Sequence, residues 1–351
     1  MQKDTIKFGL DDISIEPAVL SDISHRNSCD VYYTDVFKYQ NRIYHTLPIF
    51  TAPMPSVVNL EQYHKYMECG IIPILPRTEA LDVRLEKCRE DTLTTTAEGK
   101  TFAAFSLDEF ISILSSSHIL DNNSQYYMLI DMANGHMRKL YDIAKKAKTE
   151  HPNITLMIGN IANPKTFEEY AKIGVDYCRV SIGSGNACTT TCHTGIYYPM
   201  GSLIKECKEI KDKNKYNTKI VADGGISNFR NMIKCLALGA DFIMLGSALN
   251  KRIDSAGEIV DTAQGNKGKL YFGMASYDGQ RSLGKTICTP EGKTIINPLE
   301  GTISEFATDF EAYLKSAMSY TNSCCLSDFK NYTNILLLSD NASKQFNQTQ
   351  N

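Results

Sequence analysis

The sequence predicts a single-domain α/β protein in which eight parallel strands and eight helices alternate to form a closed (β/α)8 barrel, also called a TIM barrel. Three observations predict this fold. Short apolar runs recur along the chain, polar segments with helical character separate most of them, and a length of 351 residues suits one barrel with insertions. Apolar runs of this kind are typical of parallel strands that are buried on both faces.

The expected strands follow one another at intervals that leave room for a helix. In chain order they span residues 47–50, 71–75, 101–105, 127–131, 155–158, 177–181, 219–222 and 242–245. Helical segments are expected between them, for example at 141–150, 166–173, 200–211 and 229–238. Alternation of strand and helix predicts a parallel sheet. An open doubly wound sheet is the alternative, but it normally carries GxGxxG after its first strand, where this chain has Thr51-Ala52-Pro53-Met54-Pro55.

Two glycine-bearing segments and a polar tail interrupt the alternation. The first segment, 181–199, follows the sixth strand, and the second, 272–298, follows the eighth. We expect the barrel domain to occupy residues 1–335 and to include a mobile flap at about 275–298. Residues 336–351 should form a disordered tail, because the end of the chain is rich in Asn, Gln and Ser.

Composition and charge exclude several classes of protein. The formal net charge is −3 and the 37 basic residues are scattered, so nucleic acid is not an expected partner. The start, Met1-Gln2-Lys3-Asp4, has no apolar run behind it, and no stretch reaches the roughly 20 apolar residues of a membrane span. The 11 cysteines are irregularly spaced and form no CxxC pair. We therefore expect a cytoplasmic protein with reduced thiols and no membrane partner.

The loop after the sixth strand is the first candidate for chemistry. It reads Gly183-Ser184-Gly185-Asn186-Ala187-Cys188-Thr189-Thr190. Active sites of barrels lie at the carboxyl ends of the strands, so Cys188 in this loop is a candidate nucleophile. A free thiol has a pKa of about 8.5 and needs local help to attack at neutral pH. A buried structural cysteine beside a turn is the alternative interpretation.

The next two strand ends suit a sugar phosphate. Asp223-Gly224-Gly225 follows the seventh strand, and a carboxylate can accept hydrogen bonds from both hydroxyls of a ribose. Gly246-Ser247 follows the eighth strand. Barrels often bind phosphate between these two loops, where glycines let backbone amides approach closely. Each pair of residues is a weak signal alone, but together they place a nucleotide beside Cys188.

The loop 183–190 resembles the catalytic loop of the IMP dehydrogenase and GMP reductase family. Similar segments occur in the family's order along nearly the whole chain: residues 8–13, Asp131-Met132-Ala133-Asn134-Gly135-His136, Gly159-Asn160, 222–225, 244–247 and 271–274. The resemblance implies a purine mononucleotide substrate, a nicotinamide cofactor, a monovalent cation that we take to be potassium, and a homotetramer.

The resemblance also implies a role for each candidate residue. Cys188 would attack C2 of the purine, and Thr190 would move protons at the leaving group or the attacking water. Asp223 would hold the ribose. The other substrate contacts would be Met54, Asn186, Gly224, Gly225, Gly246, Ser247, Tyr271, Gly273 and Met274. Asp131, Asn134 and Gly135 would face the cofactor, and the carbonyl groups of Gly183, Gly185 and Cys188 would line the cation site.

Four features favour the reductase branch of the family, which converts GMP to IMP with NADPH. The chain has no room for the regulatory insertion usual in the dehydrogenases, and Ala133-Asn134-Gly135 resembles the reductase version. The segment after Met274 lacks the Arg-Tyr pair of the dehydrogenases. Glu291-Gly292-Lys293-Thr294 resembles the reductase flap, although dehydrogenases can carry Pro-Glu-Gly here too. A carboxylic acid can protonate leaving ammonia, so Glu291 is expected to act with Thr190.

Several positions depart from the family pattern. Asn186 stands where a serine is usual, Pro55 replaces an aspartate, Pro76-Arg77 replaces a histidine-containing segment, and the flap segment 277–290 is short. These changes surround the substrate and cofactor pockets. Two alternatives therefore stay open: an NAD-dependent IMP dehydrogenase without its regulatory insertion, and a nucleotide-binding regulatory protein without turnover.

Overall fold

Eight parallel strands close into a barrel, as the sequence predicts. The computed structural model describes residues 6–39, 42–91, 101–116, 118–262, 265–284, 286 and 288–348. The strands are β4 (Ile49–Thr51), β5 (Ile74–Leu75), β7 (Phe102–Phe105), β8 (Ser124–Asp131), β9 (Ile154–Ile161), β10 (Tyr177–Val180), β11 (Lys219–Asp223) and β12 (Phe242–Leu245). They pair in the order β4-β12-β11-β10-β9-β8-β7-β5. A parallel bridge between Phe50 and Ile72 joins β4 to the segment before β5 and completes the (β/α)8 barrel.

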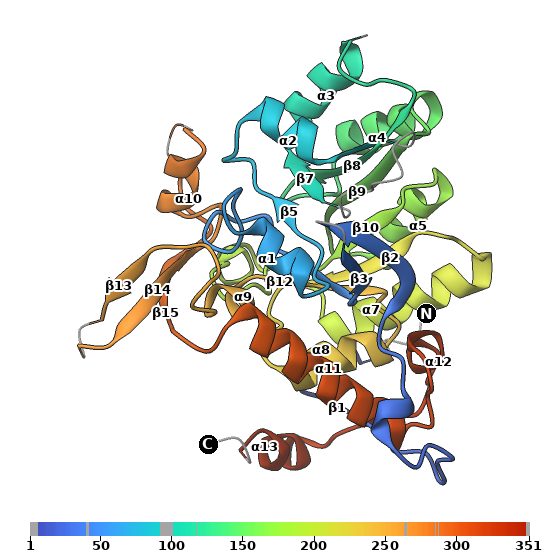
Figure 1. Cartoon of the computed structure of the whole chain (residues 1–351). Helices are drawn as coiled ribbons and strands as arrows, with labels where there is room; N and C mark the ends of the chain where they lie inside the picture. The colour runs from blue at the N-terminus through green and yellow to red at the C-terminus, as the bar shows by residue number, and fades with distance from the viewer. Residues whose placement is uncertain are drawn as a thin grey trace.

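Helices cover the outside of the barrel (Figure 1). They are α1 (Tyr63–Glu68), α2 (Leu81–Lys87), α3 (Leu107–Ser115), α4 (Arg138–Glu150), α5 (Pro164–Lys172), α7 (Met200–Asn214), α8 (Phe229–Ala237) and α11 (Ile303–Tyr320). Capping boxes begin α3 at Ser106 and α11 at Thr302, where each side-chain oxygen accepts a hydrogen bond from the backbone. These caps satisfy N–H groups that would otherwise lack partners.

Aromatic side chains fill the lower part of the barrel interior. Phe50 lies edge-on to Phe102, with ring centroids 5.4 Å apart, and to Tyr177, at 5.8 Å. Phe242, at the start of β12, stacks on Tyr33 at 4.7 Å. Tyr33 begins the hairpin of β2 (Tyr33–Tyr39) and β3 (Arg42–Thr46), so this hairpin lies against the amino-terminal end of the barrel. The packed lower interior leaves the carboxyl ends of the strands for a binding site.

A second sheet extends away from the barrel after β12 (Figure 1). The short helix α9 (Ser247–Asn250) leads to the antiparallel strands β13 (Ile259–Asp261), β14 (Lys267–Phe272) and β15 (Thr294–Pro298). Helix α10 (Tyr277–Ser282) lies between β14 and β15. The end of the expected flap is therefore the strand β15, which pairs with β14 from Phe272↔Thr294 to Gly268↔Pro298. The mobility of the flap stays a prediction.

Several smaller elements were not predicted from the sequence. They are β1 (Ile13–Ile15), the 3-10 helix Arg26–Ser28, β6 (Arg89–Asp91), which pairs antiparallel with β8, α6 (Thr190–Thr194), α12 (Leu326–Lys330), β16 (Ile335–Leu337) and α13 (Asp340–Gln348). Each is short, and β1, β6 and β16 pair with strands that are distant in the sequence. Local periodicity carries little signal for such elements.

The described part of the tail 336–351, for which we expect disorder, has regular secondary structure, and its disorder in solution stays a prediction. Strand β16 pairs antiparallel with β1, and α13 is helical. The backbone N–H of Leu338 donates to the Asp12 carbonyl at 2.8 Å, and the Ser343 hydroxyl donates to the Asp11 carbonyl at 2.8 Å. These long-range contacts hold a polar segment whose composition alone suggested disorder. Residues 349–351 lie outside the described part of the chain.

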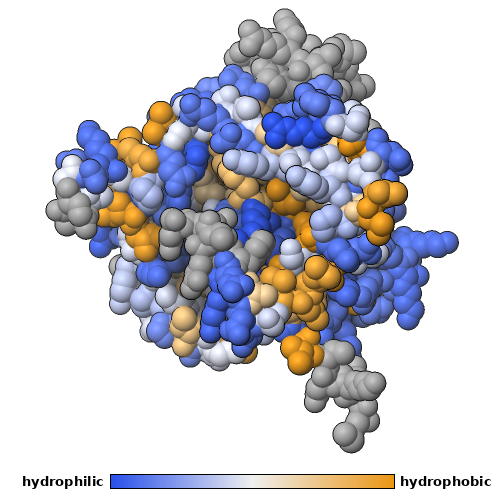
Figure 2. All heavy atoms as spheres, turned by 90° about the horizontal axis from the view of Figure 1, so that it is seen from below, coloured by the Kyte–Doolittle hydropathy of each residue, from blue (hydrophilic) through white to orange (hydrophobic). Residues whose placement is uncertain are grey.

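The cysteines form no disulfide bond among the described residues, which include all 11 of them. Within the described ranges, no helix combines the length and the apolar character needed to cross a bilayer. Figure 2 shows one face of the molecule, on which hydrophobic side chains form scattered groups around a hollow with a hydrophilic interior.

Candidate active site

A thiol, a hydroxyl and a carboxylate form a continuous chain at the carboxyl end of the barrel. The half-buried Cys188 Sγ lies 3.3 Å from Thr190 Oγ1. Thr190 Oγ1 in turn donates to Glu291 Oε2 at 2.8 Å. The pairing of Glu291 with Thr190 that the resemblance implies is thus present. A proton can pass along such a chain between the carboxyl group and a substrate bound at the sulfur.

Backbone hydrogen bonds bring the flap to the catalytic loop across about one hundred residues of sequence. The Thr189 N–H donates to the Glu291 carbonyl at 3.0 Å, and the Lys293 N–H donates to the Ala187 carbonyl at 2.9 Å. The loop and the flap therefore form a short antiparallel bridge between Cys188 and Gly292. This bridge, rather than side-chain contact alone, fixes the carboxylate beside the hydroxyl.

Asp223 is held on one of its two carboxylate oxygens. Its Oδ2 accepts from Asn160 Nδ2 at 2.7 Å and from Arg179 Nε and Nη2 at 3.2 and 2.9 Å. Among the described residues, Oδ1 has no hydrogen-bond partner. A carboxylate oxygen can accept two hydrogen bonds. The arrangement leaves Oδ1 available to the two hydroxyls of a ribose.

Arg179 is the centre of a buried charge network that was not predicted from the sequence. Its side chain points into the barrel and is 6% exposed, and its Nη1 donates to Asp131 Oδ1 at 2.7 Å. Burial favours the neutral form of Arg179, but the adjacent carboxylates of Asp223 and Asp131 outweigh it and raise the pKa of the guanidinium. Arg77 Nε lies 3.2 Å from Asp131 Oδ2 without an aligned hydrogen bond. Two arginines thus neutralise the two candidate binding carboxylates.

A signal for these residues was available in the sequence. Arg179 is the one charged residue in the expected sixth strand, at a position that alternates with Cys178 and Val180. A charge inside a barrel needs partners, and the acidic residues at neighbouring strand ends supply them. Asn160 and Arg77 carried a weaker signal, because only the fold brings their strand ends to the same place.

The candidate phosphate side is formed by Gly246, Ser247, Tyr271 and Met54. A Cβ on Gly246 would lie 2.4 Å from Tyr271 Oη, so only glycine fits there. Tyr271 Oη lies 3.6 Å from Met54 Sδ. Burial raises the pKa of Tyr271, so its phenol keeps the proton that it could donate to a phosphate oxygen. Ser247, at the start of α9, is buried beside it.

Gly224 and Gly225 lie beneath the catalytic loop. A Cβ at Gly224 would meet Ser184 Oγ at 2.5 Å, and one at Gly225 would meet the Ser184 carbonyl at 2.7 Å. Both have φ values, +100° and +71°, that side chains rarely adopt. The two glycines therefore let the loop that carries Cys188 pack on the turn after β11. The structure gives them this supporting role in addition to any contact with substrate.

The remaining candidate substrate residues lie around this centre. Asn186 is exposed at the tip of the catalytic loop, and Gly273 and Met274 are half-buried where β14 leads into the flap. A Cβ on Gly273 would lie 2.9 Å from the Ala187 carbonyl. The base of the flap is therefore in contact with the catalytic loop.

The candidate cofactor residues differ in what they can offer. Asp131 lies in the charge network, and the exposed Asn134 accepts a hydrogen bond from the His136 N–H at 3.0 Å and keeps its amide donors. Gly135 is buried, its N–H donates to the Asn160 carbonyl at 2.8 Å, and its carbonyl accepts from Tyr170 Oη at 2.8 Å. Asp131 and Asn134 fit a nicotinamide ribose or amide, whereas Gly135 has a packing role.

The candidate cation ligands are backbone carbonyl groups. The Gly185 carbonyl accepts from the Cys188 N–H at 2.9 Å, while those of Gly183 and Cys188 accept no hydrogen bond from the described residues. A carbonyl oxygen has two lone pairs, so all three have capacity left. Hard oxygen donors with free lone pairs fit a potassium ion. Such an ion would hold the loop in one conformation.

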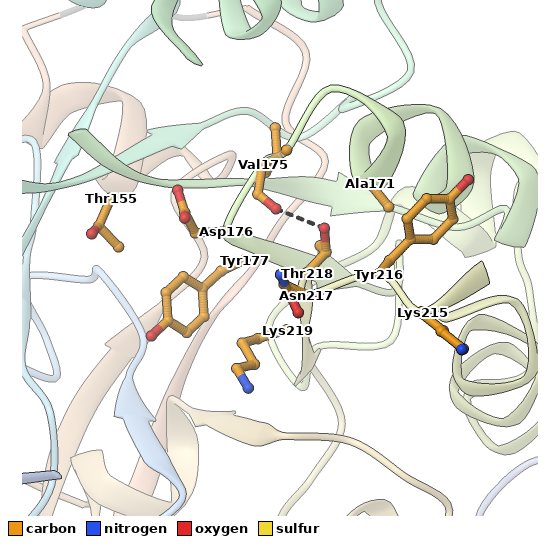
Figure 3. A pocket seen from close by; sticks show the side chains of 11 residues that line it. Thr155, Ala171, Val175, Asp176, Tyr177, Lys215, Tyr216, Asn217, Thr218 and Lys219 are labelled. Carbon is orange, nitrogen blue, oxygen red and sulfur yellow. Dashed lines mark hydrogen bonds between the residues drawn. The ribbon is translucent and has the colours of Figure 1, made fainter. Parts of the chain in front are cut away.

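A separate hollow lies at the opposite end of the barrel (Figure 3). It measures about 480 Å3 and is lined by residues at the starts of three strands, including Thr155, Tyr177 and Lys219. The Thr218 hydroxyl donates to the Val175 carbonyl at 2.7 Å beside it. The hollow is therefore distinct from the centre around Cys188, which lies at the strands' carboxyl ends.

The sequence is similar to known proteins along nearly its whole length. A family model described as IMP dehydrogenase / GMP reductase domain matches residues 8–347. The chain is 26% identical over 334 residues to a GMP reductase of Shewanella pealeana, with 94% of each chain covered. It is 27% identical over 351 residues to a GMP reductase of Citrobacter koseri, with 98% of this chain and 99% of the relative covered. A GMP reductase of Escherichia coli O81 is 28% identical over 354 residues.

Proposed function

This chain belongs to the IMP dehydrogenase / GMP reductase family, and we propose that it reduces GMP to IMP with NADPH. The reaction consumes GMP, NADPH and two protons and yields IMP, NADP+ and ammonium. The observation that carries the proposal is the Cys188–Thr190–Glu291 chain. It supplies a nucleophile together with an acid for an amine leaving group.

In the first half of the reaction, the Cys188 thiolate attacks C2 of the guanine ring. The S–C2 bond forms, and the bond from C2 to the exocyclic nitrogen breaks. Glu291, acting through the Thr190 hydroxyl, delivers a proton to the leaving nitrogen, so that ammonia rather than an amide anion departs. The product of this half is a thioimidate bound covalently to Cys188.

NADPH, when bound, supplies a hydride to C2 in the second half. The C2–S bond then breaks and Cys188 returns to the thiolate. Asp131 and Asn134 would orient the nicotinamide end of the cofactor from the mouth of the barrel, and Arg77 and Arg179 fix the Asp131 carboxylate. The carbonyl groups of Gly183, Gly185 and Cys188 would hold a potassium ion, whose charge would keep the catalytic loop in one conformation.

The substrate would be held at both ends of its ribose phosphate. Asp223 Oδ1 would accept from the ribose hydroxyls, and the backbone N–H groups of Gly246 and Ser247 and the Tyr271 hydroxyl would donate to the phosphate. This division requires a ribonucleotide with both hydroxyls. The purine would then lie over Cys188, with Met274 against the base.

Two parallel assays test the proposal. One contains GMP and NADPH and the other IMP and NAD, both with potassium, and absorbance of the reduced cofactor is followed. We expect loss of absorbance and release of ammonia in the first assay. A rise in the second alone would instead make the chain an IMP dehydrogenase. No change of absorbance in either assay, together with tight binding of GMP, would instead indicate a nucleotide-binding protein without turnover.

The Cys188→Ala variant separates chemistry from binding. We expect no turnover and largely unchanged GMP affinity, because the thiol forms a bond only in the reaction. Full turnover by this variant would eliminate the covalent mechanism. We also propose a homotetramer, which light scattering of the purified chain can test.

A further inference from the structure

We propose that two buried amides, Asn250 and Asn297, position the catalytic flap relative to the nucleotide phosphate, so that phosphate binding helps to set Glu291 for catalysis. This inference rests on the proposed function. It assigns both asparagines as positioning residues that act through Ser247 and Glu291 rather than by touching the reacting atoms.

The side chains form an ordered series of hydrogen bonds. Asn297 Nδ2 donates to Asn250 Oδ1 at 2.7 Å, and Asn297 Oδ1 accepts from the Ser247 hydroxyl at 3.3 Å. Asn250 Nδ2 donates to the Ser56 carbonyl at 2.7 Å and to the Leu270 carbonyl at 3.0 Å. Each amide thus uses both its donor and its acceptor ends.

The series joins the segments that carry Met54, Ser247, Tyr271 and Glu291. Ser56 lies in the turn that begins at Met54, Ser247 begins α9, Leu270 precedes Tyr271 on β14, and Asn297 lies on β15 six residues after Glu291. These segments are remote in sequence. The two amides link all four of them through side-chain hydrogen bonds.

Burial makes this link stiff. Asn250 is fully buried, Asn297 is 6% exposed and Ser247 is 7% exposed. In such surroundings water cannot readily replace a lost partner, so each hydrogen bond restricts the geometry of the next. Tyr271 pairs with Ile295 in the same β14–β15 ladder that carries Asn297. A shift of the paired strands β14 and β15 relative to α9 would therefore move Tyr271 and Glu291 together, away from Ser247.

Enzymes can use binding energy from a remote part of the substrate to improve the reacting geometry, so that truncated substrates lose kcat as well as affinity. The phosphate of GMP is such a remote group. A phosphate bound by both Ser247 and Tyr271 would fix α9 relative to strands β14 and β15. Through the hydrogen bonds of Asn250 and Asn297, it would then also restrict the position of Glu291. Guanosine, which lacks the phosphate, would leave the flap less well placed.

The test compares kcat for GMP and guanosine, at saturation where it is reached, in three variants and the wild type. Asn297→Val deletes both hydrogen bonds of Asn297 and suits a strand. Asn297→Thr keeps a hydroxyl that can make one of them, and guards against a failure of the valine variant to fold. Asn266→Leu is the matched control, because Asn266 is an exposed asparagine next to β14 outside the network. Thermal unfolding establishes that each variant is folded.

We expect kcat for GMP to exceed that for guanosine by about 10-fold or more in the wild type and in Asn266→Leu, within the usual range of coupling between sites. In Asn297→Val the ratio should fall to about 3-fold or less, with Asn297→Thr between them. An unchanged ratio in the folded Asn297 variants would overturn the inference and leave the proposed function standing.

Turnover by the wild type distinguishes failure of the proposed function from failure of this inference. If the wild type turns over neither compound, the same comparison is made on alkylation of Cys188 by iodoacetamide. We then expect GMP to slow alkylation more than saturating guanosine does in the wild type, and equally little in Asn297→Val. Equal protection by both compounds in the wild type would overturn the inference on this readout.

Discussion

Replacing Glu291 by glutamine should remove the acid from the proposed mechanism while leaving the site in place. Glutamine can still accept the hydrogen bond that Thr190 Oγ1 donates at 2.8 Å. The backbone bonds through the Glu291 carbonyl and the Lys293 N–H are unaffected by the change. The carboxamide cannot supply a proton, however, and the amine must then leave C2 without help.

The magnitude follows from these contacts. Positioned general acids contribute about 100- to 10,000-fold to a rate, which corresponds to about 3–5 kcal/mol of transition-state stabilisation. The Glu291 side chain is exposed, so its removal should change the free energy of unfolding by less than about 1 kcal/mol. We therefore expect a large loss of kcat, a small change in KM for GMP, and an unchanged melting temperature.

Stopped-flow absorbance of NADPH and a parallel ammonia assay measure the effect. Glu258→Gln is the matched control, because Glu258 is exposed and directly precedes β13 in the second sheet. Thr190→Val should lose rate to a similar degree, and the two changes should not be additive, because both interrupt one proton path. A Glu291→Gln enzyme within about 3-fold of wild-type kcat would refute the assignment of Glu291 as the acid.

Three further predictions concern stability. Arg179→Leu leaves the Asp223 carboxylate without its buried cation, so urea unfolding should show a loss of about 3–5 kcal/mol, and a loss below 1 kcal/mol would contradict the network. Ser181 has a φ of 121°, a strain of about 1–3 kcal/mol that Ser181→Gly would relieve, at the cost of the hydrogen bond to Ser184. Calorimetry should therefore show a free energy of unfolding that is about 1 kcal/mol higher in the variant. A lower melting temperature would contradict the strain. Burial lowers the pKa of Lys269 from 10.5 to about 8. The unfolded chain then binds more protons between these values. From about pH 8 to pH 10.5, the free energy of unfolding should therefore rise more, or fall less, with pH in the wild type than in Lys269→Met, and equal slopes would refute the lowered pKa.

The barrel could be predicted from the sequence because each of its strands is a short local pattern that recurs along the chain. Each of the eight predicted apolar runs coincides with a barrel strand, and the Phe50–Ile72 bridge closes the ring that their number suggested. The secondary structure of the tail could not be predicted, for the opposite reason. Strand β16 and helix α13 depend on pairing with β1 and on hydrogen bonds to Asp11 and Asp12, and composition contains no record of such contacts.

At the candidate site, residues next to one another in the chain were the predictable ones. Cys188 and Thr190 lie in one loop whose composition resembles a family loop, so their proximity follows from the sequence. The selective engagement of Asp223 Oδ2 by Asn160 and Arg179 does not, because it depends on which way three strands face at one height of the barrel. The same holds for Arg77, whose position beside Asp131 is set by strand order alone.

By itself, then, the sequence determined the alternation of strands and helices, the loop that carries the thiol, and the family resemblance, because these are properties of short contiguous segments. Only the tertiary structure decided that Glu291 reaches Thr190 through a backbone bridge, that hydrogen bonds within the described part of the chain engage Oδ2 of Asp223 but not Oδ1, and that Asn250 and Asn297 join four remote segments. The physical reason is that hydrogen bonds and ion pairs act over a few ångströms in space. Segments far apart in the chain meet at that range only once the barrel has closed.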